Sequence, residues 1–312
     1  MATQRDTIGW IGIGRMGFAM AERLAKAGAD LAVWNRTRAK AEPLAARGAK
    51  IADRLVDLAA RDIVFVMVST WDDVREVVAG PQGLLSGARA PRLVVECSSI
   101  SLEGSAELRE ILAARGVALL AAPVSGNAKV IKAGRLSFVC SGPKSAYDAA
   151  LPWLRAIAPA ASYVGEGELS RIVKICHNVF LGVVTQSLAE ITVLAQKAGV
   201  PRHAFLDFMN QSVMGSTFSR YKSPAFVNLD FKVTFTPKLL RKDLDLGLDA
   251  ARRFEVPMPL ASLTRDLVQT LIGHGMDEED FAKLIVLQEM ASGLELAPEN
   301  VAVDDGLAEQ PR

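Results

Sequence analysis

The fold is decided by one stretch near the N-terminus, Ile8-Gly-Trp-Ile-Gly12-Ile-Gly14-Arg-Met-Gly17. It begins as a short apolar run, typical of a buried strand, and continues as a G-x-G-x-x-G pattern that opens a helix. In that context the first glycine allows a tight turn, the second lets the backbone approach a pyrophosphate, and the third lets helix and strand pack closely. The helix N-terminus adds free N–H donors for the anion. We therefore expect a dinucleotide to be held by Gly12, Ile13, Gly14, Arg15, Met16 and Gly17.

Outward from this motif, short apolar runs alternate with segments of helical periodicity. This alternation is typical of a parallel sheet covered by helices on both faces. We expect strands at residues 8–13, 31–35, 63–68, 93–96, 117–120 and 136–140. We expect helices at residues 16–27, 55–60, 72–79 and 102–114. The first part of the chain, residues 1–165, is therefore predicted to be an α/β Rossmann domain that binds a dinucleotide.

The pattern changes near Gly165-Glu-Gly167, after which no segment has the pattern of a strand. Helices are expected at residues 169–197, 202–211, 236–254, 260–274 and 281–295. The segment from residue 298 to residue 312 is polar and aperiodic, and we expect it to be loosely held. Residues 166–312 are therefore predicted to form an all-α domain for the substrate and for oligomerisation.

Composition narrows the class of protein. The 312 residues carry 36 basic and 35 acidic side chains, a net charge of +1, so neither a nucleic-acid nor a membrane-surface partner is expected. There is no apolar signal segment before the first strand and no apolar run of about 20 residues. The odd set Cys97, Cys140 and Cys176 lacks metal-ligand spacing, which indicates reduced, mostly buried thiols in a cytoplasmic protein.

The end of the second predicted strand bears on the choice of cofactor. A carboxylate there would accept hydrogen bonds from the adenosine ribose and would repel a 2′-phosphate. This chain has Asn35-Arg36-Thr37-Arg38 instead, and guanidinium groups suit a phosphate because they donate two hydrogen bonds at once. We therefore expect NADP rather than NAD, held in part by Asn35, Arg36, Thr37 and Arg38.

The long helix expected at residues 169–197 carries a group of polar side chains. Lys174, His177 and Asn178 fall within about one turn of each other. An apolar stripe is expected on the opposite side, made of Ile172, Ile175, Cys176, Val179, Phe180 and Val183. Such a polar group is often only a solvated helix face. Here the helix starts at the junction of the two domains, where ligand clefts commonly lie. A lysine desolvated there would exchange a proton with a substrate hydroxyl.

Two loops that follow strands offer further ligand-binding groups. Residues 96–100, Glu96-Cys-Ser-Ser-Ile, end a strand at the carboxyl edge where α/β sheets bind ligands. Residues 122–127, Ala122-Pro-Val-Ser-Gly-Asn, also follow a strand, and their small side chains expose backbone N–H groups suited to a carboxylate. Either segment alone is also compatible with an ordinary turn or helix cap.

Together these motifs resemble the β-hydroxyacid dehydrogenase family, which includes 3-hydroxyisobutyrate dehydrogenase, tartronate semialdehyde reductase and glyoxylate/succinic semialdehyde reductases. The resemblance runs from Ile8 to about Glu295. Four motifs occur in order: residues 12–20, the Ala122-Pro-Val-Ser-Gly126 loop, Gly167-x6-Lys174-x3-Asn178, and Phe235-x6-Lys242-Asp243-Leu244.

The resemblance implies a role for individual residues. Lys174 matches the proton-relay lysine of the family, and Asn178 matches its substrate-contacting amide. Cofactor contacts are implied for Val68, Ser69, Ser99 and Lys242. Substrate contacts are implied for Ser125, Gly126, Asn127, His177, Phe235 and Asp243. The implied reaction is the reversible oxidation of a small anionic hydroxy acid to its semialdehyde or keto acid. A homodimer or homotetramer is also implied.

Departures from the family pattern leave alternatives open. Ala121 and Asn127 stand where relatives have aspartate and glycine, so we expect a substrate bulkier or more polar than 3-hydroxyisobutyrate. The loop after Val68 has Ser69-Thr70 where many members have a proline. His177 matches the Lys-x-x-His-Asn pattern of 6-phosphogluconate dehydrogenases, which favours oxidative decarboxylation of a sugar acid as a second hypothesis. Imine reduction, or a non-catalytic dinucleotide sensor or scaffold, is less compatible with the retained Lys174.

Overall fold

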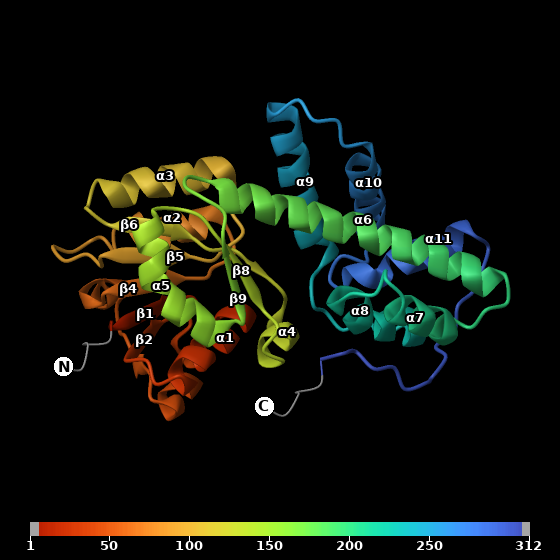
Figure 1. The fold of residues 1–312 in the computed structure, drawn as a ribbon, viewed down its shortest axis with the longest axis horizontal. Coiled ribbons are helices and arrows are strands. Elements are labelled where there is room, and N and C mark those ends of the chain that lie inside the picture. Colours follow the sequence, from red (N-terminus) through yellow and green to blue (C-terminus); the bar gives the residue numbers. More distant parts are fainter. Residues whose placement is uncertain (1–5, 308–312) are drawn as a thin grey trace. The chain divides into compact units, whose positions relative to one another are not determined.

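The computed structural model describes residues 6–307 of the chain. It divides into two compact units, Met1–Lys174 and Ile175–Arg312, coloured red to green and green to blue in Figure 1. The division falls inside one long helix, α6 (Leu169–Lys197). The sequence had placed the domain boundary slightly earlier, between residues 165 and 166.

The first unit is built on a six-stranded sheet in the order β3-β2-β1-β4-β5-β6, and every strand pair in it is parallel. Its strands are β1 (Ile8–Ile11), β2 (Leu31–Trp34), β3 (Lys50–Ile51), β4 (Ile63–Val66), β5 (Leu93–Glu96) and β6 (Ala118–Ala121). The order reverses beside β1, between β2 and β4. In a doubly wound sheet this switch point is where a ligand binds at the carboxyl ends of the strands. The predicted Rossmann architecture is confirmed.

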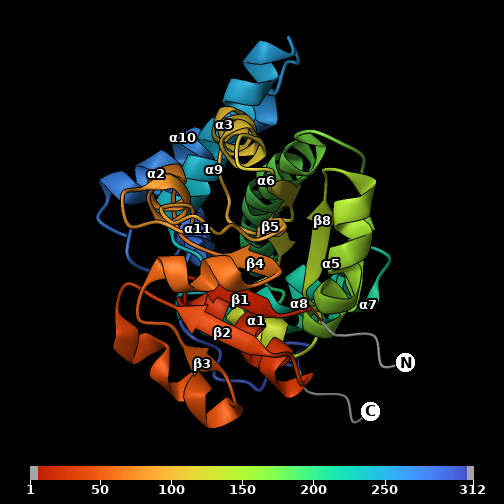
Figure 2. The same cartoon turned by 90° about the vertical axis from the view of Figure 1, so that its left-hand side faces the viewer.

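Helices cover both faces of this sheet, as Figures 1 and 2 show. Side chains alternate between the two faces along each strand: in β4, Ile63 and Phe65 belong to one buried cluster, while Val64 and Val66 belong to the other. The first cluster packs under α1 (Arg15–Lys26) and α5 (Lys144–Ile157), and the second under α2 (Trp71–Ala79) and α3 (Leu102–Ala113). Burial on both faces explains why the strands read as continuous apolar runs.

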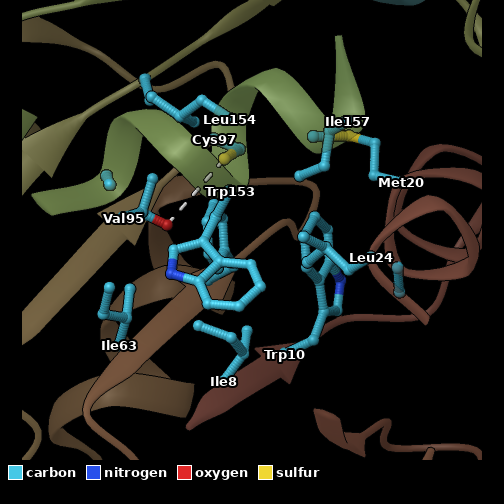
Figure 3. Packing of buried hydrophobic residues seen from close by; sticks show 14 of the residues in the cluster. Ile8, Trp10, Met20, Leu24, Ile63, Val95, Cys97, Trp153, Leu154 and Ile157 are labelled. Atoms are coloured by element: carbon cyan, nitrogen blue, oxygen red, sulfur yellow. Dashed lines mark hydrogen bonds between the residues drawn. The ribbon is translucent and has the colours of Figure 1, made fainter. Parts of the chain in front are cut away.

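The first cluster extends to the glycine loop. Figure 3 shows Trp10 and Leu24 packed beside Ile157, with Trp153 above Ile8. Trp10 stacks on Phe65 with ring centroids 5.3 Å apart, and its indole N–H donates a 3.0 Å hydrogen bond to the carbonyl of Gly12. The core therefore fixes the backbone at the first glycine of the cofactor motif.

Several elements of the first unit were not predicted from the sequence, among them the 14-residue helix α5 and a number of short elements. The segment expected as a sixth strand is β8 (Ser137–Cys140), which lies in a separate three-stranded sheet between β7 (Val124–Ser125) and β9 (Ala160–Tyr163). Residues 55–60 form a 3-10 helix rather than an α-helix. The short helix α4 (Ala128–Lys132) and the two 3-10 helices Arg38–Lys40 and Glu42–Arg47 were also unexpected. Runs this short carry too few residues to show a period.

The described part of the second unit is helical, as predicted. After α6 come α7 (Arg202–Gln211), α8 (Thr217–Asn228), α9 (Pro237–Arg253), α10 (Pro259–Gly273), the 3-10 helix Phe281–Lys283 and α11 (Leu284–Ala291). Helix α8 was missed because Pro224 interrupts it and its apolar residues are not concentrated on one face. Its start carries a sequence signal nonetheless: Ser216 accepts a hydrogen bond from the backbone N–H of Ser219, as an N-cap does.

Helix α6 is long and apolar enough to cross a membrane by length and hydropathy alone, with a mean hydropathy of 1.4 over its most apolar 18 residues. Half of that window is buried inside the protein. Part of its apolar side packs on α9, where a Cβ at Gly247 would come 2.2 Å from Val179 and one at Gly182 would come 3.3 Å from Leu244. Close helix packing of this kind explains the apolar composition of α6.

The expectation of a loosely held tail is wrong as far as residue 303. Leu294, Leu296, Val301 and Val303 pack against the buried cluster of the second unit. Asn228 donates a 2.8 Å hydrogen bond from Nδ2 to the carbonyl of Val301. The apolar residues of this segment are irregularly spaced and form neither a helix nor a strand, so the sequence pattern did not reveal that they pack against the protein. Residues 308–312 lie outside the described part of the chain.

Candidate active site

The glycine loop is shaped as a dinucleotide site requires. Gly12 has φ +96°, and a Cβ there would come 2.1 Å from the carbonyl oxygen of Met67. A Cβ at Gly17 would come 1.9 Å from the carbonyl oxygen of Gly12, so neither position accepts a side chain. Gly14 is exposed, and a Cβ there would meet no atom of a residue distant in the sequence within 4 Å. As the N-cap residue of α1, it has no side chain to cap the helix. The first-turn N–H groups thus fit a pyrophosphate, including those of Arg15 and Met16.

The loop is tied to the end of β2 by Asn35. Its Oδ1 accepts a 2.8 Å hydrogen bond from the N–H of Ile13, and its Nδ2 donates to the carbonyl of Thr37. Arg36 is largely exposed, 3.7 Å from Asp73, and Arg38 lies 2.5 Å from an exposed carboxylate oxygen of Asp53. Ion pairs as exposed as these contribute little to stability, so both guanidinium groups can turn to an anionic ligand.

The ends of β4 and β5 are joined by Glu96 and Ser98, which lie in the loop singled out from the sequence but were given no individual role there. The backbone N–H of Val68 donates a 2.9 Å hydrogen bond to Ser98 Oγ, and the N–H of Ser98 donates a 2.7 Å bond to Glu96 Oε1. Ser98 and Glu96 are fully buried. Of the predicted cofactor contacts, Ser69 is exposed and Ser99 is half-buried. The signal that was available is a charged residue at the last position of an apolar strand.

Glu96 is paired with Arg171 from the first turn of α6. The guanidinium of Arg171 forms an ion pair with the Glu96 carboxylate and donates a 2.6 Å bond to the carbonyl of Ser98, and both charged side chains are essentially buried. Arg171 Nε also donates to Ser105 Oγ of α3, at 3.2 Å. The helix that carries Lys174 is therefore fastened to the carboxyl end of β5.

The loop expected to anchor the substrate lies between β7 and α4. Gly126 has φ +134°, and a Cβ there would come 2.8 Å from Val130. Ser125 is half-buried at the end of β7. Asn127 is the N-cap of α4, because its Oδ1 accepts hydrogen bonds from the N–H groups of Lys129 and Val130. The amide oxygen of Asn127 is thus committed to the helix, and Nδ2 is the part available to a ligand.

The apolar stripe predicted along α6 is wrong in part. Ile175 and Val179 are buried, but Cys176 and Phe180 are exposed, and the buried side includes the polar Asn178. Helix α9 accounts for this, because it supplies both the Gly247 groove for Val179 and a polar partner for Asn178. Lys174 is half-buried, and His177 is exposed.

The second unit gathers four of the predicted residues. Asn178 Nδ2 donates a 2.5 Å hydrogen bond to Asp243 Oδ2, and both side chains are buried. His177 Nδ1 lies 2.9 Å from Asn178 Oδ1, and Lys242 Nζ lies 3.6 Å from Asp243 Oδ1. The ring of Phe235 lies edge-on to that of Phe281, with centroids 5.9 Å apart.

The cysteines of the described chain, and its possible metal ligands, are also candidates for a functional site. Cys97 and Cys140 are buried, as predicted, and burial raises the pKa of Cys140 to about 12 and that of Cys97 well above its ordinary value. Cys176 is exposed, which agrees with the expectation of mostly buried thiols but not with its place in the predicted apolar stripe of α6. Within residues 6–307 no group of three His, Cys, Asp or Glu side chains is placed to hold a metal ion.

Known proteins share both halves of this arrangement. A family model described as the NAD binding domain of 6-phosphogluconate dehydrogenase matches residues 7–165, and one described as "NAD-binding of NADP-dependent 3-hydroxyisobutyrate dehydrogenase" matches residues 168–288. The chain is 30% identical to 2-(hydroxymethyl)glutarate dehydrogenase of Eubacterium barkeri, over 93% of this chain and 97% of that one. It is 29% identical to the chloroplastic glyoxylate/succinic semialdehyde reductase 2 of Arabidopsis thaliana, over 93% and 81% of the two chains.

A solved structure, the 3-hydroxyisobutyrate dehydrogenase of Salmonella typhimurium, superposes with a TM-score of 0.80 at 25% identity, covering 90% of this chain and 99% of that one. With the glycine loop, the six-stranded sheet and the helical second unit, these matches define the class: an NAD(P)-dependent oxidoreductase that acts on CH–OH groups. The chain belongs to the β-hydroxyacid dehydrogenase family.

Proposed function

We propose that this protein reversibly oxidises a small β-hydroxy acid to the corresponding semialdehyde or keto acid with NADP, and that Lys174 relays the proton. The observation that carries the proposal is α6, which bears Lys174 one turn after the anchored Arg171 and bears Asn178 in a buried hydrogen bond to Asp243. A lysine and an amide fixed along one helix face supply the base and the donor that alcohol oxidation needs.

The residues divide the chemistry as follows. NADP held at the glycine loop of Gly12, Gly14 and Gly17 would supply the hydride-transfer chemistry. Lys174 Nζ accepts the hydroxyl proton in oxidation and gives a proton back to the carbonyl oxygen in reduction. Asn178 orients the reacting oxygen from the same helix. Backbone N–H groups at Ser125 and Gly126 and the Nδ2 of Asn127 hold the anionic end of the substrate.

We propose NADP as the preferred dinucleotide. Arg36 and Arg38 follow β2, where a carboxylate would discriminate against a 2′-phosphate. Arg36 pairs with the half-exposed Asp73 and Arg38 with the exposed Asp53. The description of the family model over residues 168–288, which names an NADP-dependent enzyme, supports this choice. Contacts to the nicotinamide side are proposed for Val68, Ser69, Ser99 and Lys242.

A second candidate is oxidative decarboxylation of a sugar acid. It is favoured by His177, which lies 2.9 Å from Asn178, and by the match of residues 7–165 to a 6-phosphogluconate dehydrogenase domain. Release of carbon dioxide in step with NADPH formation would identify it. The presence of Lys174 at the family's relay position argues against imine reduction and against a purely non-catalytic role.

The deciding experiment is a substrate screen with the purified protein and both dinucleotides. Hydroxy acids, phosphorylated sugar acids and semialdehydes are tested for turnover, each acid beside its neutral methyl ester. We expect acids to be preferred over their esters by about 100-fold, the scale of a charge-assisted interaction. Because Ala121 and Asn127 depart from the relatives, we expect 3-hydroxyisobutyrate to rank below bulkier or more polar acids. Equal turnover of acids and esters would contradict the proposed anion anchor.

We also propose that the protein is a homodimer or homotetramer in the cytoplasm. Large apolar side chains are exposed in the second unit at Phe180, Phe208, Val213 and Met214. Exposed apolar side chains of this size are typical of surfaces that another subunit covers. Light scattering of the purified protein, beside a Phe208→Ser/Val213→Ser variant, tests the assembly: a monomeric mass in the wild type contradicts it.

A further inference from the structure

We propose that the buried ion pair between Glu96 and Arg171 is a positioning device, which places Lys174 against the loops after β4 and β5. The inference rests on the proposed role of Lys174 and adds two residues to which the family resemblance assigns no role. Every residue in the argument belongs to the first unit, which ends at Lys174.

The ion pair joins three segments that are far apart in the sequence. Arg171 contacts the carboxylate of Glu96 and the carbonyl of Ser98, and it reaches Ser105 on α3. Glu96 in turn accepts from the N–H of Ser98, whose hydroxyl accepts from the N–H of Val68. A single buried network therefore fixes the backbone after β4, the backbone after β5 and the first turn of α6.

Helix geometry carries this fixation to the lysine. Residues three apart in an α-helix lie on nearly the same face, about one turn along the axis. The guanidinium of Arg171 makes three contacts, with Ser105, Ser98 and Glu96. Together they fix the position of the first turn of α6 along the helix axis and its rotation about that axis. Lys174 follows one turn later, so a rotation of the first turn of α6 would move its side chain directly. Ser99, for which a contact to the nicotinamide is proposed, directly follows Ser98 of the network in the sequence.

Stability alone does not account for the ion pair. A buried ion pair gains little over apolar side chains of similar volume, because removing both charges from water costs as much as their attraction returns. The start of α6 is also anchored twice without it. Ser170 donates from its hydroxyl to the carbonyl of Ala121 and from its N–H to Ser141 Oγ, and Arg109 pairs with Glu168 at 2.9 Å. Arg171 additionally fixes the orientation of the first turn of α6 relative to the loop after β5.

The test is a mutant cycle between Glu96→Gln and Lys174→Ala, measured as single-turnover hydride transfer with the best substrate of the screen. Glu96→Gln keeps the shape of the side chain and removes its charge. We expect it to slow hydride transfer by about 10–100-fold, the effect of misplacing a reacting group by about 1 Å. In the Lys174→Ala background the same change should cost less than threefold, since no lysine remains to be misplaced. The Kd for NADPH should change less than threefold in either background.

Two further variants separate positioning from a general loss of stability. Leu154→Ala, on the buried side of α5, serves as the control, because it should lower Tm without removing any group of the network. It should leave the single-turnover rate within threefold. Arg171→Lys retains the positive charge but loses the planar guanidinium that makes several hydrogen bonds at once. If Glu96→Gln does not fold, Arg171→Lys replaces it in the mutant cycle with Lys174→Ala. Hydrogen exchange provides a readout independent of turnover: Glu96→Gln should speed exchange at residues 97–100 and 170–175 selectively, unlike Leu154→Ala.

The outcomes are distinct. A full additional loss from Glu96→Gln in the Lys174→Ala background overturns the positioning role while leaving the lysine relay intact. A rate for Lys174→Ala within threefold of wild type instead overturns the proposed function itself. Non-additivity together with local, selective exchange supports the inference.

Discussion

Asn178 donates a 2.5 Å hydrogen bond from Nδ2 to Oδ2 of Asp243, and less than a tenth of either residue is exposed. An ionised carboxylate only accepts hydrogen bonds, so the amide nitrogen of Asn178 must face Asp243. Its oxygen then faces His177 Nδ1 at 2.9 Å, so Nδ1 carries a hydrogen and donates it to Asn178 Oδ1. A buried aspartate on α9 thus determines which polar group α6 offers to a ligand.

We predict that Asp243→Asn lowers kcat/KM for the hydroxy acid and leaves the protein folded. The variant removes a charge-assisted hydrogen bond and allows the Asn178 amide to flip. Losing such a bond costs about 1.5–3 kcal/mol, so kcat/KM for the hydroxy acid should fall about 10–100-fold. Asp249→Asn, an exposed position on the same helix, is the matched control. Steady-state kinetics that are the same in the two variants would show that Asp243 does not orient Asn178.

We predict that Lys174→Ala folds and binds NADPH but loses most of its turnover. Positioned general acid–base catalysis contributes about 10²–10⁴-fold, and no other described side chain has been assigned this proton. Single-turnover hydride transfer measures the loss, and fluorescence titration measures NADPH binding. Lys197→Ala, near the other end of α6, controls for the removal of a positive charge from the helix. A loss smaller than threefold would make Lys174 a structural residue.

Much of this site could be predicted from the sequence because its signals are local. The glycine loop has a fixed spacing within a strand–turn–helix, and the structure gives the steric reason, since a Cβ at Gly12 or Gly17 would collide with backbone oxygens. Residues such as Lys174 and Asn178 follow from one helix period. Most of the longer helices and the central parallel strands were predictable for the same reason, but the 14-residue helix α5 was not predicted.

The rest depends on partners distant in the sequence. The apolar stripe on α6 was misassigned because Asn178 is buried by Asp243, 65 residues away. Arg171 reads as an ordinary helix-surface arginine until its contact with Glu96, 75 residues earlier, is seen. Asn127 suggested a substrate contact, yet its oxygen caps the five-residue helix α4, which is too short for periodicity to reveal. Side-chain pairings of this kind are set by tertiary packing rather than by local spacing.

The C-terminal segment leads to a prediction about pH. Glu299 accepts hydrogen bonds from the N–H groups of Arg202 and His203 at the start of α7, and from His203 Nδ1. Burial acts to raise the pKa of Glu299, but these hydrogen bonds and the Arg202 charge together hold it below its ordinary value of 4.5. A carboxylate with a lowered pKa stabilises the folded state above the unfolded pKa, and this contribution is lost as the pH falls through the folded pKa.

Glu299→Gln should therefore lower Tm by about 2–4 °C at neutral pH, the shift that corresponds to about 1 kcal/mol in a protein of this size class. The difference between wild type and variant should shrink as the pH falls below 4.5. Thermal unfolding from pH 3 to pH 8 measures it, with the exposed Glu295→Gln as the control. A difference that stays constant over this range would mean that the ionised carboxylate of Glu299 does not hold the segment on α7.

The preference for NADP is predicted to depend on Arg36. This side chain is 88% exposed and only 3.7 Å from the half-exposed Asp73, so little must be broken before it turns to a 2′-phosphate. Arg36→Ala should lower kcat/KM for NADP by the equivalent of about 1.5–3 kcal/mol, about 10–100-fold, because a charge-assisted hydrogen bond is lost. The value for NAD should change less than twofold, since NAD has no phosphate at that position.

Arg38→Ala should act in the same direction but less strongly, because Arg38 must first leave Asp53, and Asp53→Asn should then favour NADP further. Arg155→Ala, an exposed arginine on α5, controls for the change in net charge. Ionic strength adds a second criterion: the Arg36 effect on NADP should diminish as salt screens the exposed charges. A wild-type enzyme that prefers NAD tenfold, or an Arg36→Ala variant that loses both dinucleotides equally, would show that the residues after β2 support the loop rather than select the phosphate.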